Sequence, residues 1–522
     1  MNIVDAWDIF SKAMGAYTEN NYIKAKEIIS TINILDDQED ESVTRLLRRK
    51  KWLLGHILKE LEDNQNAVKV FSSITRSESG VFYADAMIQI YVITKEVKYL
   101  KNINLSDSTN IYGEAQFLLG MLEDSIENQI EYWGNIPRES EIYLKENYQI
   151  NIVKNIAELE GNQFKNQLYE IFEKVNEILK ILFVNNKYEQ LIAHYTNLTV
   201  SKLLLSKVEN ENFFQPLSKL RLNTINLMND PEEGQLINNL LCLYPKITTQ
   251  DSAFIACFTL HHDSLNQFRL YAKEGQQEAS GLSFVLDRDF FAKEHNTSRI
   301  YEKETLLNQD KVKEEDHTLA AMPLYRCIYF DPTSGLVKVA QREKWSFWRE
   351  FKLEGKYPWY AENKKAEQNW GEYIHGVNHM DGIKNIEKRV KKCLEELSKL
   401  VEAIDLDGMN SKEQELLAEI VLPLRYLMKH MAFKEEQECR IVYVTKMENP
   451  LVKYDKEIKR IYIDYEPSVM EHVEKIYLAP KAKDEKTFME YLCAHGQTVR
   501  QHKVTKESNG RVQVKISQNP FR

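Results

Sequence analysis

The sequence predicts an α + β protein in which an all-α helical repeat array precedes a C-terminal α+β domain. Apolar residues recur with helical spacing through the first part, and strand-like stretches appear only near residue 190 and beyond. The 522 residues are also too many for one hydrophobic core, because single cores rarely grow beyond about 300 residues. We therefore expect a helical domain at 1–180 and an α+β domain at 190–522.

The helical prediction rests on apolar residues that recur every three or four positions. Five stretches show this spacing: Ala6–Tyr17, Leu46–Leu61, Ala84–Ile93, Ala115–Ile126 and Ile142–Leu159. Short polar runs separate them, and glycine and proline are scarce in this part of the chain. Helices joined by such short turns pack as antiparallel neighbours.

Small residues recur within this part at matching positions. Ala13 and Ala25 have the same spacing as Gly55 and Ala67, and Gly120 lies in a similar local sequence to Gly55. Small residues at a helix crossing let two helices approach closely. The pattern resembles degenerate tetratricopeptide repeats, which implies a scaffold that binds a protein partner or trigger. A plain helical bundle is the alternative interpretation.

Strands and helices mix in the second part. The strand-like stretches are Leu191–Thr196, Ala253–Leu260, Gly281–Leu286, Tyr325–Phe330, Cys439–Val444, Arg460–Ile463, Lys475–Leu478 and Val499–Val504. Leu198–Ser206 has a helical pattern, and the charged, periodic segment Asp381–Leu427 predicts one or two inserted helices near 381–427. Strands with inserted helices are typical of an α+β domain.

Composition narrows the class of protein. The chain has a formal net charge of −10, which argues against non-specific coating of DNA or RNA, so nucleic acid is expected only as a modified target. We see no apolar run long enough for a membrane span and no secretory pattern at the start, and we expect a cytoplasmic protein. The six cysteines lack zinc-ligand spacing. We expect them to be reduced thiols and assign no metal ligands.

Five short motifs in the second part form a recognisable set. They are His194-Tyr195-Thr196, the segment 227–234 with Asn229-Asp230-Pro231, the segment 264–271, the segment 433–440 with Glu436-Gln437-Glu438-Cys439-Arg440, and the segment 517–522 with Pro520-Phe521-Arg522. Over roughly residues 190 to 522 the set resembles the bacterial family known as domain of unknown function 2971. Phe268 departs from it, because the family often has tryptophan there. The resemblance implies an effector behind helical repeats in a phage-defence setting.

An early-strand histidine with a late-strand Glu-x-Glu is similar to the site layout of ADP-ribosyltransferases. That similarity implies an ADP-ribosyltransferase-like fold with NAD as the substrate. It assigns Glu438 as the catalytic carboxylate, which would stabilise positive charge on the ribose as nicotinamide departs. Glu436 would orient the acceptor, and His194 and Tyr195 would position NAD.

Further residues complete the predicted cofactor-binding set. Arg269 or Arg221 would bind the pyrophosphate through bidentate contacts, and Tyr271 is a candidate ring to stack on nicotinamide. We include Asn229 and Asp230 of the turn in the same set.

Several of these residues also have a purely structural interpretation. Glu438 and Arg440 are two apart on one strand, the spacing of a structural ion pair. His194 fits a histidine within the core, and Asn229-Asp230-Pro231 fits a turn that starts a helix. The aromatic stretches 345–348 and 357–360 fit either packing of an inserted segment or a wall for stacking a nucleobase.

Two other functions remain open at this stage. One is a nucleotide- or peptide-binding module without turnover, which would use the same pocket. The other is a metal-dependent nuclease built from Asp230, Glu232 and Glu438, since hard cations prefer clustered carboxylates. We find no P-loop, dinucleotide fingerprint or nucleophile elbow in the sequence.

Overall fold

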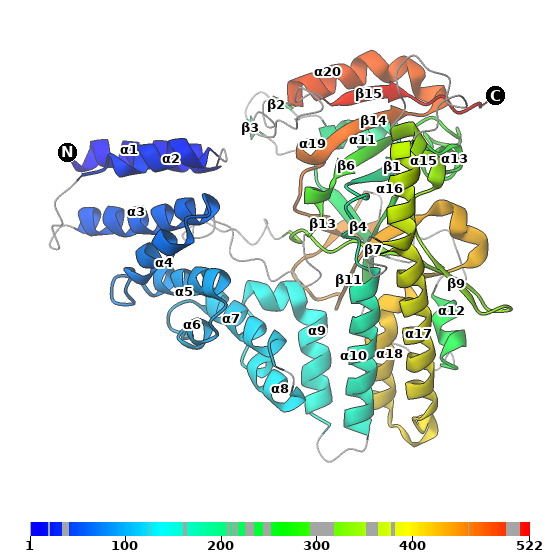
Figure 1. Cartoon of the computed structure of the whole chain (residues 1–522), viewed down its shortest axis with the longest axis horizontal. Helices are drawn as coiled ribbons and strands as arrows, with labels where there is room; N and C mark the ends of the chain where they lie inside the picture. Colours follow the sequence, from blue (N-terminus) through cyan, green and yellow to red (C-terminus); the bar gives the residue numbers. More distant parts are fainter. Residues whose placement is uncertain are drawn as a thin grey trace. The chain divides into compact units, whose positions relative to one another are not determined.

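A computed structural model describes most of the chain. The described residues are 2–18, 21–33, 41–123, 125–159, 164–205, 209–210, 213–214, 218–224, 234–243, 252–292, 318–350, 364–376, 382–457, 459–496 and 512–521. They form two compact units, one in Met1–Lys154 and one in Asn155–Thr297 with His317–Arg522. Helices and a large sheet are both present (Figure 1), as expected for α + β.

The first unit is helical throughout its described part. Its helices are α1 (Ile3–Thr18), α2 (Tyr22–Ser30), α3 (Glu41–Glu60), α4 (Asn64–Ser72), α5 (Gly80–Thr94), α6 (Lys98–Lys101), α7 (Thr109–Met121), α8 (Ile126–Gly134) and α9 (Glu141–Ala157). Successive helices from α1 to α8 pack against their neighbours in the chain. All five helical stretches predicted from the sequence coincide largely with helices.

Small residues mark the closest helix contacts. An added Cβ at Gly55 of α3 would lie 2.6 Å from the Phe71 ring of α4, and one at Gly120 of α7 would lie 2.2 Å from Trp133 Nε1 of α8. Both aromatic rings are buried. The short distances between these helices therefore depend on glycine at both positions.

A buried polar network links α3 to α5. The carboxylate of Asp85 accepts hydrogen bonds from Trp52 Nε1 at 2.6 Å and from His56 Nε2 at 3.0 Å. All three side chains are buried. Because an unpaired carboxylate would be costly there, these bonds fix the register between the two helices.

The second unit is built around a ten-stranded sheet. Its strands are β1 (Leu191–Thr196), β4 (Leu220–Thr224), β5 (Ser252–Thr259), β6 (Leu282–Asp287), β7 (Tyr325–Arg326), β11 (Glu438–Thr445), β12 (Val452–Asp455), β13 (Arg460–Tyr465), β14 (Val473–Leu478) and β15 (Gln513–Ile516). The main order is β12-β13-β4-β5-β1-β6-β14-β15, and β11 pairs with β5 and β7. Among the strands that the structure describes in this sheet, β14 and β15 are the one parallel pair.

Strand β5 is the junction of this sheet. It pairs along its whole length with β11, from Ser252 opposite Thr445 to Thr259 opposite Glu438. Its other edge pairs first with β4 and then, at Thr259, with Ala193 of β1. Ala193, Thr259 and Glu438 therefore form one row across three strands.

Smaller elements complete the second unit. Strands β8 (Ile328–Asp331), β9 (Leu336–Val339) and β10 (Met428–His430) form a second sheet, and β2 (Glu209–Asn210) pairs with β3 (Phe213–Phe214). The α-helices are α10 (Phe164–Leu182), α11 (Leu198–Leu205), α12 (Gln235–Leu240), α13 (Leu265–Tyr271), α15 (Lys344–Glu350), α16 (Lys364–His375), α17 (Ile383–Glu402), α18 (Ser411–Arg425), α19 (Val469–His472) and α20 (Lys486–Gly496). The 3-10 turns are η2 (Arg288–Phe290), η5 (Leu406–Gly408), η6 (Met431–Glu436) and η7 (Pro480–Glu485).

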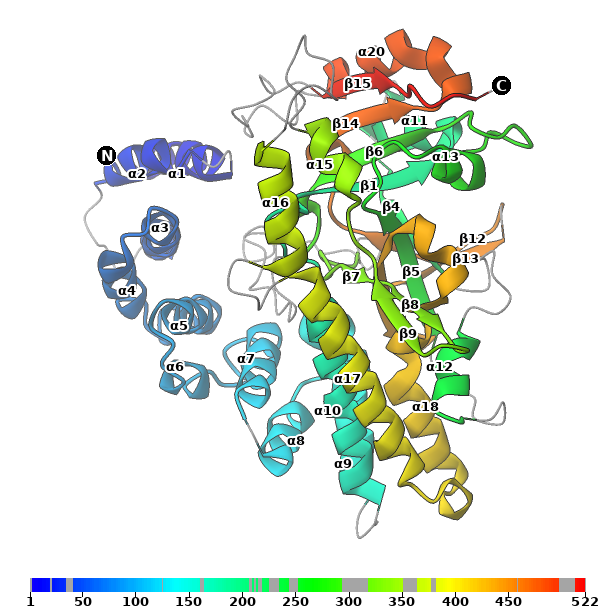
Figure 2. The same ribbon diagram turned by 45° about the vertical axis from the view of Figure 1, so that its right-hand side comes forward.

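The boundary between the units differs from the predicted one. The predicted helical domain at 1–180 includes most of α10, but the apolar face of this helix packs against α17 and α18. The three helices run side by side in Figures 1 and 2. The second unit consequently starts at Asn155, because the insertion predicted at 381–427 folds as two helices that cover α10.

The remaining sequence predictions for this unit have mixed outcomes. Seven of the strand-like stretches overlap strands, and the stretch at 325–330 is divided between β7 and β8. Val499–Val504 lies outside the described residues. All six cysteines are free thiols. Among the described helices, none is both long and apolar enough to cross a membrane.

Candidate functional site

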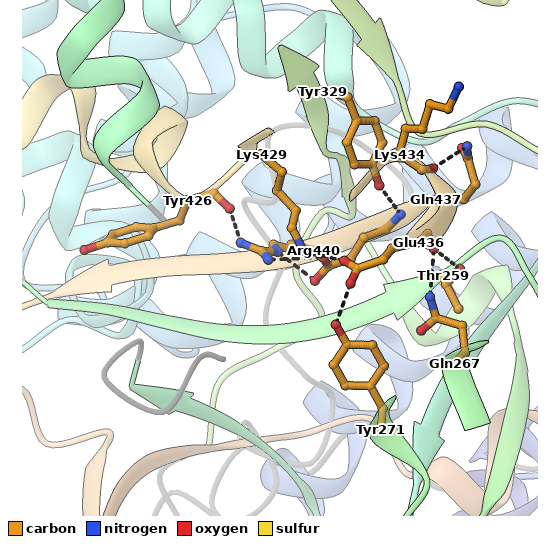
Figure 3. Close-up of polar contacts among 11 residues, drawn as sticks. Thr259, Gln267, Tyr271, Tyr329, Tyr426, Lys429, Lys434, Glu436, Gln437 and Arg440 are labelled. Atoms are coloured by element: carbon orange, nitrogen blue, oxygen red, sulfur yellow. Dashed lines mark hydrogen bonds and ion pairs between the residues drawn. The ribbon is translucent and has the colours of Figure 1, made fainter. Parts of the chain in front are cut away.

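The predicted catalytic carboxylates lie in a buried charge cluster of Lys429, Glu436, Glu438 and Arg440 (Figure 3). Lys429 Nζ lies 2.8 Å from Glu438 Oε2 and also donates to Glu436 Oε2. Arg440 donates to both oxygens of Glu438, at 2.8 and 3.1 Å. All four residues are less than a tenth exposed, so this cluster pairs two cations with two carboxylates.

Local backbone geometry brings both carboxylates to one lysine. Gln437 has a left-handed conformation with φ 46°, which separates the end of η6 from the start of β11. Lys429 lies on β10 and reaches Glu436 and Glu438 on either side of that turn. The backbone N–H of Glu438 donates to Tyr329 Oη at 2.8 Å.

The cations set the charge state of Glu438. Burial alone would raise the pKa of this carboxyl, but Arg440 and Lys429 lower it below its ordinary value. Burial likewise opposes the charge on Lys429, and the nearby Glu438 and Glu436 raise its pKa instead. Glu438 is thus an ionised carboxylate whose oxygens are both occupied by cations, which is the structural ion pair considered in the sequence.

Tyr271 joins this cluster from α13. Its Oη donates to Glu436 Oε1 at 2.8 Å, and Figure 3 shows the hydroxyl of Tyr271 pointing toward Glu436. Burial, and then Glu436, raise the pKa of Tyr271, so the phenol keeps its proton. The backbone carbonyl of Glu436 also accepts from Thr259 Oγ1 and Gln267 Nε2. Tyr271 therefore supports Glu436.

His194 does not share a site with Glu438, contrary to the sequence prediction. Ala193 and Glu438 lie in one row with Thr259, and successive side chains on a strand point to opposite faces. The imidazole of His194 accordingly projects to the opposite face, where its ring lies 5.5 Å from that of Phe258. Its Nδ1 donates to the carbonyl of Cys257 at 2.9 Å, and burial lowers its pKa. These are features of a histidine within the core.

The predicted pyrophosphate-binding arginines are engaged elsewhere. Arg221 Nη1 lies 2.9 Å from Asp455 Oδ2, and its guanidinium lies over the Tyr462 ring. Arg269 Nε lies 2.9 Å from Glu278 Oε2 on an exposed surface. Neither arginine lines the pocket described below. The remaining predicted residues, Asn229 and Asp230, lie outside the described residues, as does Glu232.

A pocket of about 540 Å³ lies close to the charge cluster. It is lined by His261, Asp263, Ser264, Leu265, Asn266, Glu343, Trp345, Arg349, Glu435 and Asn519. These residues come from the segment that joins β5 to α13 and the start of α13, from α15 and the residue before it, from η6, and from the segment after β15. The pocket thus combines an imidazole, a guanidinium, three carboxylates and an indole ring.

Burial sets the protonation of two groups in this pocket. It lowers the pKa of His261 to about 4, so the imidazole is neutral at pH 7. His261 is 6% exposed, and its Nδ1 has no hydrogen-bond partner among the described residues. Burial, and then the neighbouring Glu435, raise the pKa of Glu343. A carboxyl with a raised pKa beside a second carboxylate is a pattern found in acid–base sites.

Trp345 forms one wall of the pocket. Its ring is stacked on that of His261, with centroids 5.6 Å apart and planes at 2°. Arg349, one helical turn further along α15, places its guanidinium 4.5 Å from the Trp345 ring centroid. Arg349 Nη1 also lies 3.7 Å from Asp263 Oδ2. Trp345 is 41% exposed, so part of the indole remains accessible.

Buried hydrogen bonds hold both walls of the pocket. Tyr195 Oη donates to the carbonyl of His261 and accepts from the N–H of Ser264, each at 2.9 Å. The start of α15 is held through Arg342, whose N–H donates to Tyr373 Oη at 2.8 Å. Tyr195, predicted to contact NAD, is therefore behind the pocket wall.

Arg342 and Tyr373 belong to a larger buried network. Tyr373 Oη donates to Glu189 Oε1 at 2.5 Å, and Arg326 pairs with both oxygens of Glu189. Arg342 Nη1 donates to the carbonyl of Tyr188 at 2.6 Å. Because buried networks of hydrogen bonds and ion pairs fix geometry, this one helps to define the position of α15 and hence of Trp345.

Three of the sequence motifs supply residues to the pocket. The residues they supply are neighbours of the predicted site residues and not those residues themselves. Ser264 and Asn266 belong to the segment 264–271, Glu435 to 433–440, and Asn519 to 517–522. The aromatic stretch at 345–348 is divided, because Phe347 is buried and Trp345 lines the pocket. The segment 357–360 lies outside the described residues.

Sequence reasoning missed His261, Asp263, Glu343 and Arg349. The run His261-His262-Asp263 directly follows a buried strand, a place where polar side chains often serve a site. That signal was available in the sequence. The pairing of Glu343 with Glu435 was not, because the two are far apart in the chain and meet only through the fold.

The described residues contain one group with metal-ligand spacing, Glu177, Cys393 and Glu396. Lys174 Nζ donates to Glu177 Oε2 at 2.6 Å and to Glu396 Oε2 at 2.8 Å. The ammonium of Lys174 already occupies an oxygen of each carboxylate, and the group lies on α10 and α17, apart from the pocket-lining segments. It offers no support for a metal-dependent nuclease.

Comparison with known proteins adds no relative. No family model, curated protein or solved structure matches the chain.

Proposed function

We propose that the second unit is an NAD-consuming effector domain whose reaction takes place in the Trp345–Glu343 pocket rather than at Glu438. The observation that carries the proposal is the meeting of Glu343, with its raised pKa, and Glu435 in a pocket walled by an accessible indole. Two carboxyl groups in different environments are the usual apparatus for cleaving a glycosidic bond.

In this proposal each pocket residue has a chemical role. Glu435 stabilises the positive charge that develops on the ribose as the bond to nicotinamide breaks. Glu343 takes the proton of the attacking water, since a base with a raised pKa accepts it more readily. The products are nicotinamide, ADP-ribose and a proton. With a protein nucleophile in place of water, the same step transfers ADP-ribose to a target.

The helical unit would supply regulation. We propose that α1 to α9 bind a protein partner or trigger, in keeping with their likeness to tetratricopeptide repeats, and that the whole acts in bacterial defence against phage. The successive packing of α1 to α8 supports a scaffold role for this unit.

Nicotinamide release by the purified full chain tests the reaction. We expect Glu343→Gln and Glu435→Gln each to slow release by at least about a hundredfold, the usual scale of general acid–base and electrostatic contributions. Glu278→Gln is the matched control, because Glu278 is exposed and pairs with Arg269 outside the pocket.

Two outcomes would contradict the proposed reaction. One is full activity in both pocket variants. The other is a wild-type chain that neither releases nicotinamide in vitro nor depletes NAD in cells that express it.

A second candidate, binding without turnover, is favoured by the state of Glu436 and Glu438. Both predicted catalytic carboxylates are paired with buried cations, so the likeness to ADP-ribosyltransferases does not extend to their geometry. In this case NAD would be recovered unchanged after long incubation, and calorimetry would show binding that Glu343→Gln alters in affinity only.

A further inference from the structure

The charge of the pocket points to the kind of ligand it accepts. Three carboxylates, Asp263, Glu343 and Glu435, line it against a single guanidinium, that of Arg349. His261 adds no positive charge at neutral pH, because burial lowers its pKa to about 4. The lining as a whole is therefore acidic, which disfavours a polyanion and favours a cation.

The protein already places a planar cation in this pocket. The guanidinium of Arg349 lies over the face of Trp345 and beside the carboxylate of Asp263, at the distances given above. The side chain of Arg349 is 59% exposed, and its contact with Asp263 is longer than a hydrogen bond. Arg349 is thus held loosely, by attractions that a ligand cation with a delocalised charge would also receive.

His261 provides an independent indication of a ligand. Its ring stacks on that of Trp345, and its buried Nδ1 lacks a hydrogen-bond partner among the described residues. A buried polar atom without a partner costs free energy in a native structure. A ligand with a polar group beside its ring would supply the missing hydrogen bond.

We infer that the pocket selects planar aromatic cations and that Arg349 is a built-in competitor for the position over Trp345. The inference rests on the proposed function in choosing the nicotinamide ring as the probe, since that ring is cationic in NAD⁺ and neutral in NADH. The inference predicts that the pocket binds the oxidised cofactor, NAD⁺. It also predicts that nucleotides whose only charges are phosphates do not bind.

Calorimetric titration of the full chain tests this selection with two small probes, 1-methylnicotinamide (a cation) and nicotinamide (neutral). We expect the cation to bind at least about tenfold more tightly at low salt, and its advantage to fall as ionic strength rises. Trp345→Leu should abolish that advantage. Equal binding of the two probes overturns the inference.

Variants of Arg349 give the sharper result. Arg349→Ala should tighten binding of 1-methylnicotinamide about two- to fivefold, because it removes the competing cation–π contact. Arg460→Ala is the matched control, as this exposed arginine of β13 does not line the pocket. Weaker binding by Arg349→Ala would show that the guanidinium binds the ligand, and would refute its role as a competitor.

The experiments can refute either proposal without refuting the other. If 1-methylnicotinamide binds as expected but NAD is never cleaved, the proposed reaction is wrong and the cation selection stands. If NAD is cleaved while the neutral and cationic probes bind equally, the reaction stands and the selection is wrong.

Discussion

At the scale of single residues, the buried charge cluster shows how one motif can serve structure or chemistry. Glu436 and Glu438 have the spacing of a catalytic Glu-x-Glu, yet Lys429 and Arg440 occupy their oxygens. A buried ion pair is strongly destabilised when one partner is removed, because the other is left uncompensated in a medium of low dielectric constant. Substitution of a single charged residue should therefore reveal how much the cluster contributes to stability.

Lys429→Met is expected to lower the free energy of unfolding of the second unit by about 3–5 kcal/mol, because it leaves two carboxylates beside one guanidinium. Denaturant unfolding measures this change. Lys434→Met is the control, since Lys434 is exposed, and it should change stability by less than about 0.5 kcal/mol. Addition of Glu436→Gln to Lys429→Met should restore part of the loss. An unchanged midpoint for Lys429→Met would contradict this account.

The sequence could predict part of this cluster and not the rest. Glu438 and Arg440, two apart on a strand, indicated an ion pair from spacing alone. Lys429 lies on another strand, and its approach depends on the left-handed turn at Gln437. The prediction that His194 shares a site with Glu438 failed for a related reason. The alternation of side chains along β1 was visible in the sequence, but which face would meet Glu438 depended on a strand pairing that the sequence does not reveal.

At the scale of elements, the helical unit depends on close approaches between helices. The Cβ that Gly120 lacks would overlap Trp133, and that indole cannot readily move. It is stacked on Phe117 at 5.3 Å, and its Nε1 donates to the carbonyl of Phe117 at 3.1 Å. Gly15 of α1 is a helical glycine with no atom near its absent Cβ. The two positions therefore separate the effect of packing from helix propensity.

Gly120→Ala is expected to destabilise the helical unit by about 1–2 kcal/mol, because overpacking against Trp133 outweighs the gain in helix propensity. Gly15→Ala should stabilise it by about 0.5–1 kcal/mol through propensity alone. Thermal unfolding followed by circular dichroism compares the two variants. If both variants raise the melting temperature, the close approach of α7 and α8 is not as tight as the structure indicates.

Element prediction succeeded where the periodic signal was local. The stretch Leu191–Thr196 is strand β1 to the residue, and Leu198–Leu205 is helix α11, as its pattern predicted. The predicted boundary at residue 180 placed most of α10 in the helical domain, because an amphipathic helix has a buried face without its sequence showing what buries that face. Its partners, α17 and α18, lie more than half the second unit away in the chain.

At the scale of the molecule, the second unit contains buried imidazoles that are neutral at pH 7. Burial lowers the pKa of His261 to about 4 and that of His262 to about 3. In the unfolded chain both would titrate near 6.5. As pH falls below 6.5, these imidazoles become protonated in the unfolded state but stay neutral in the folded state. The free energy of unfolding therefore decreases until the pH reaches the pKa values of the folded state. Glu343, with its raised pKa, acts in the opposite direction.

We expect the free energy of unfolding of the second unit to fall by about 2 kcal/mol per imidazole, for His261 and His262, between pH 7.5 and pH 5. Denaturant unfolding at the two values measures the difference. His262→Asn should reduce this pH dependence by about half, whatever its effect on stability at pH 7.5. A pH dependence that is the same with and without His262 would show that its imidazole takes up its proton at the same pH in the folded and unfolded states, which would contradict the lowered pKa.

The row of Ala193, Thr259 and Glu438 has a consequence for the order in which the protein forms. Helices α1 to α8 contact mainly their immediate neighbours, so each can settle soon after the ribosome releases it. Strand β5 cannot complete its long edge until β11 has been translated, well after β5 itself, and pairings between such distant segments form slowly. During that interval β5 presents an apolar strand with unsatisfied N–H and C=O groups, the kind of surface that seeds aggregation or recruits a chaperone. Nascent chains stalled between residues 260 and 437 should therefore be the species that chaperones retain.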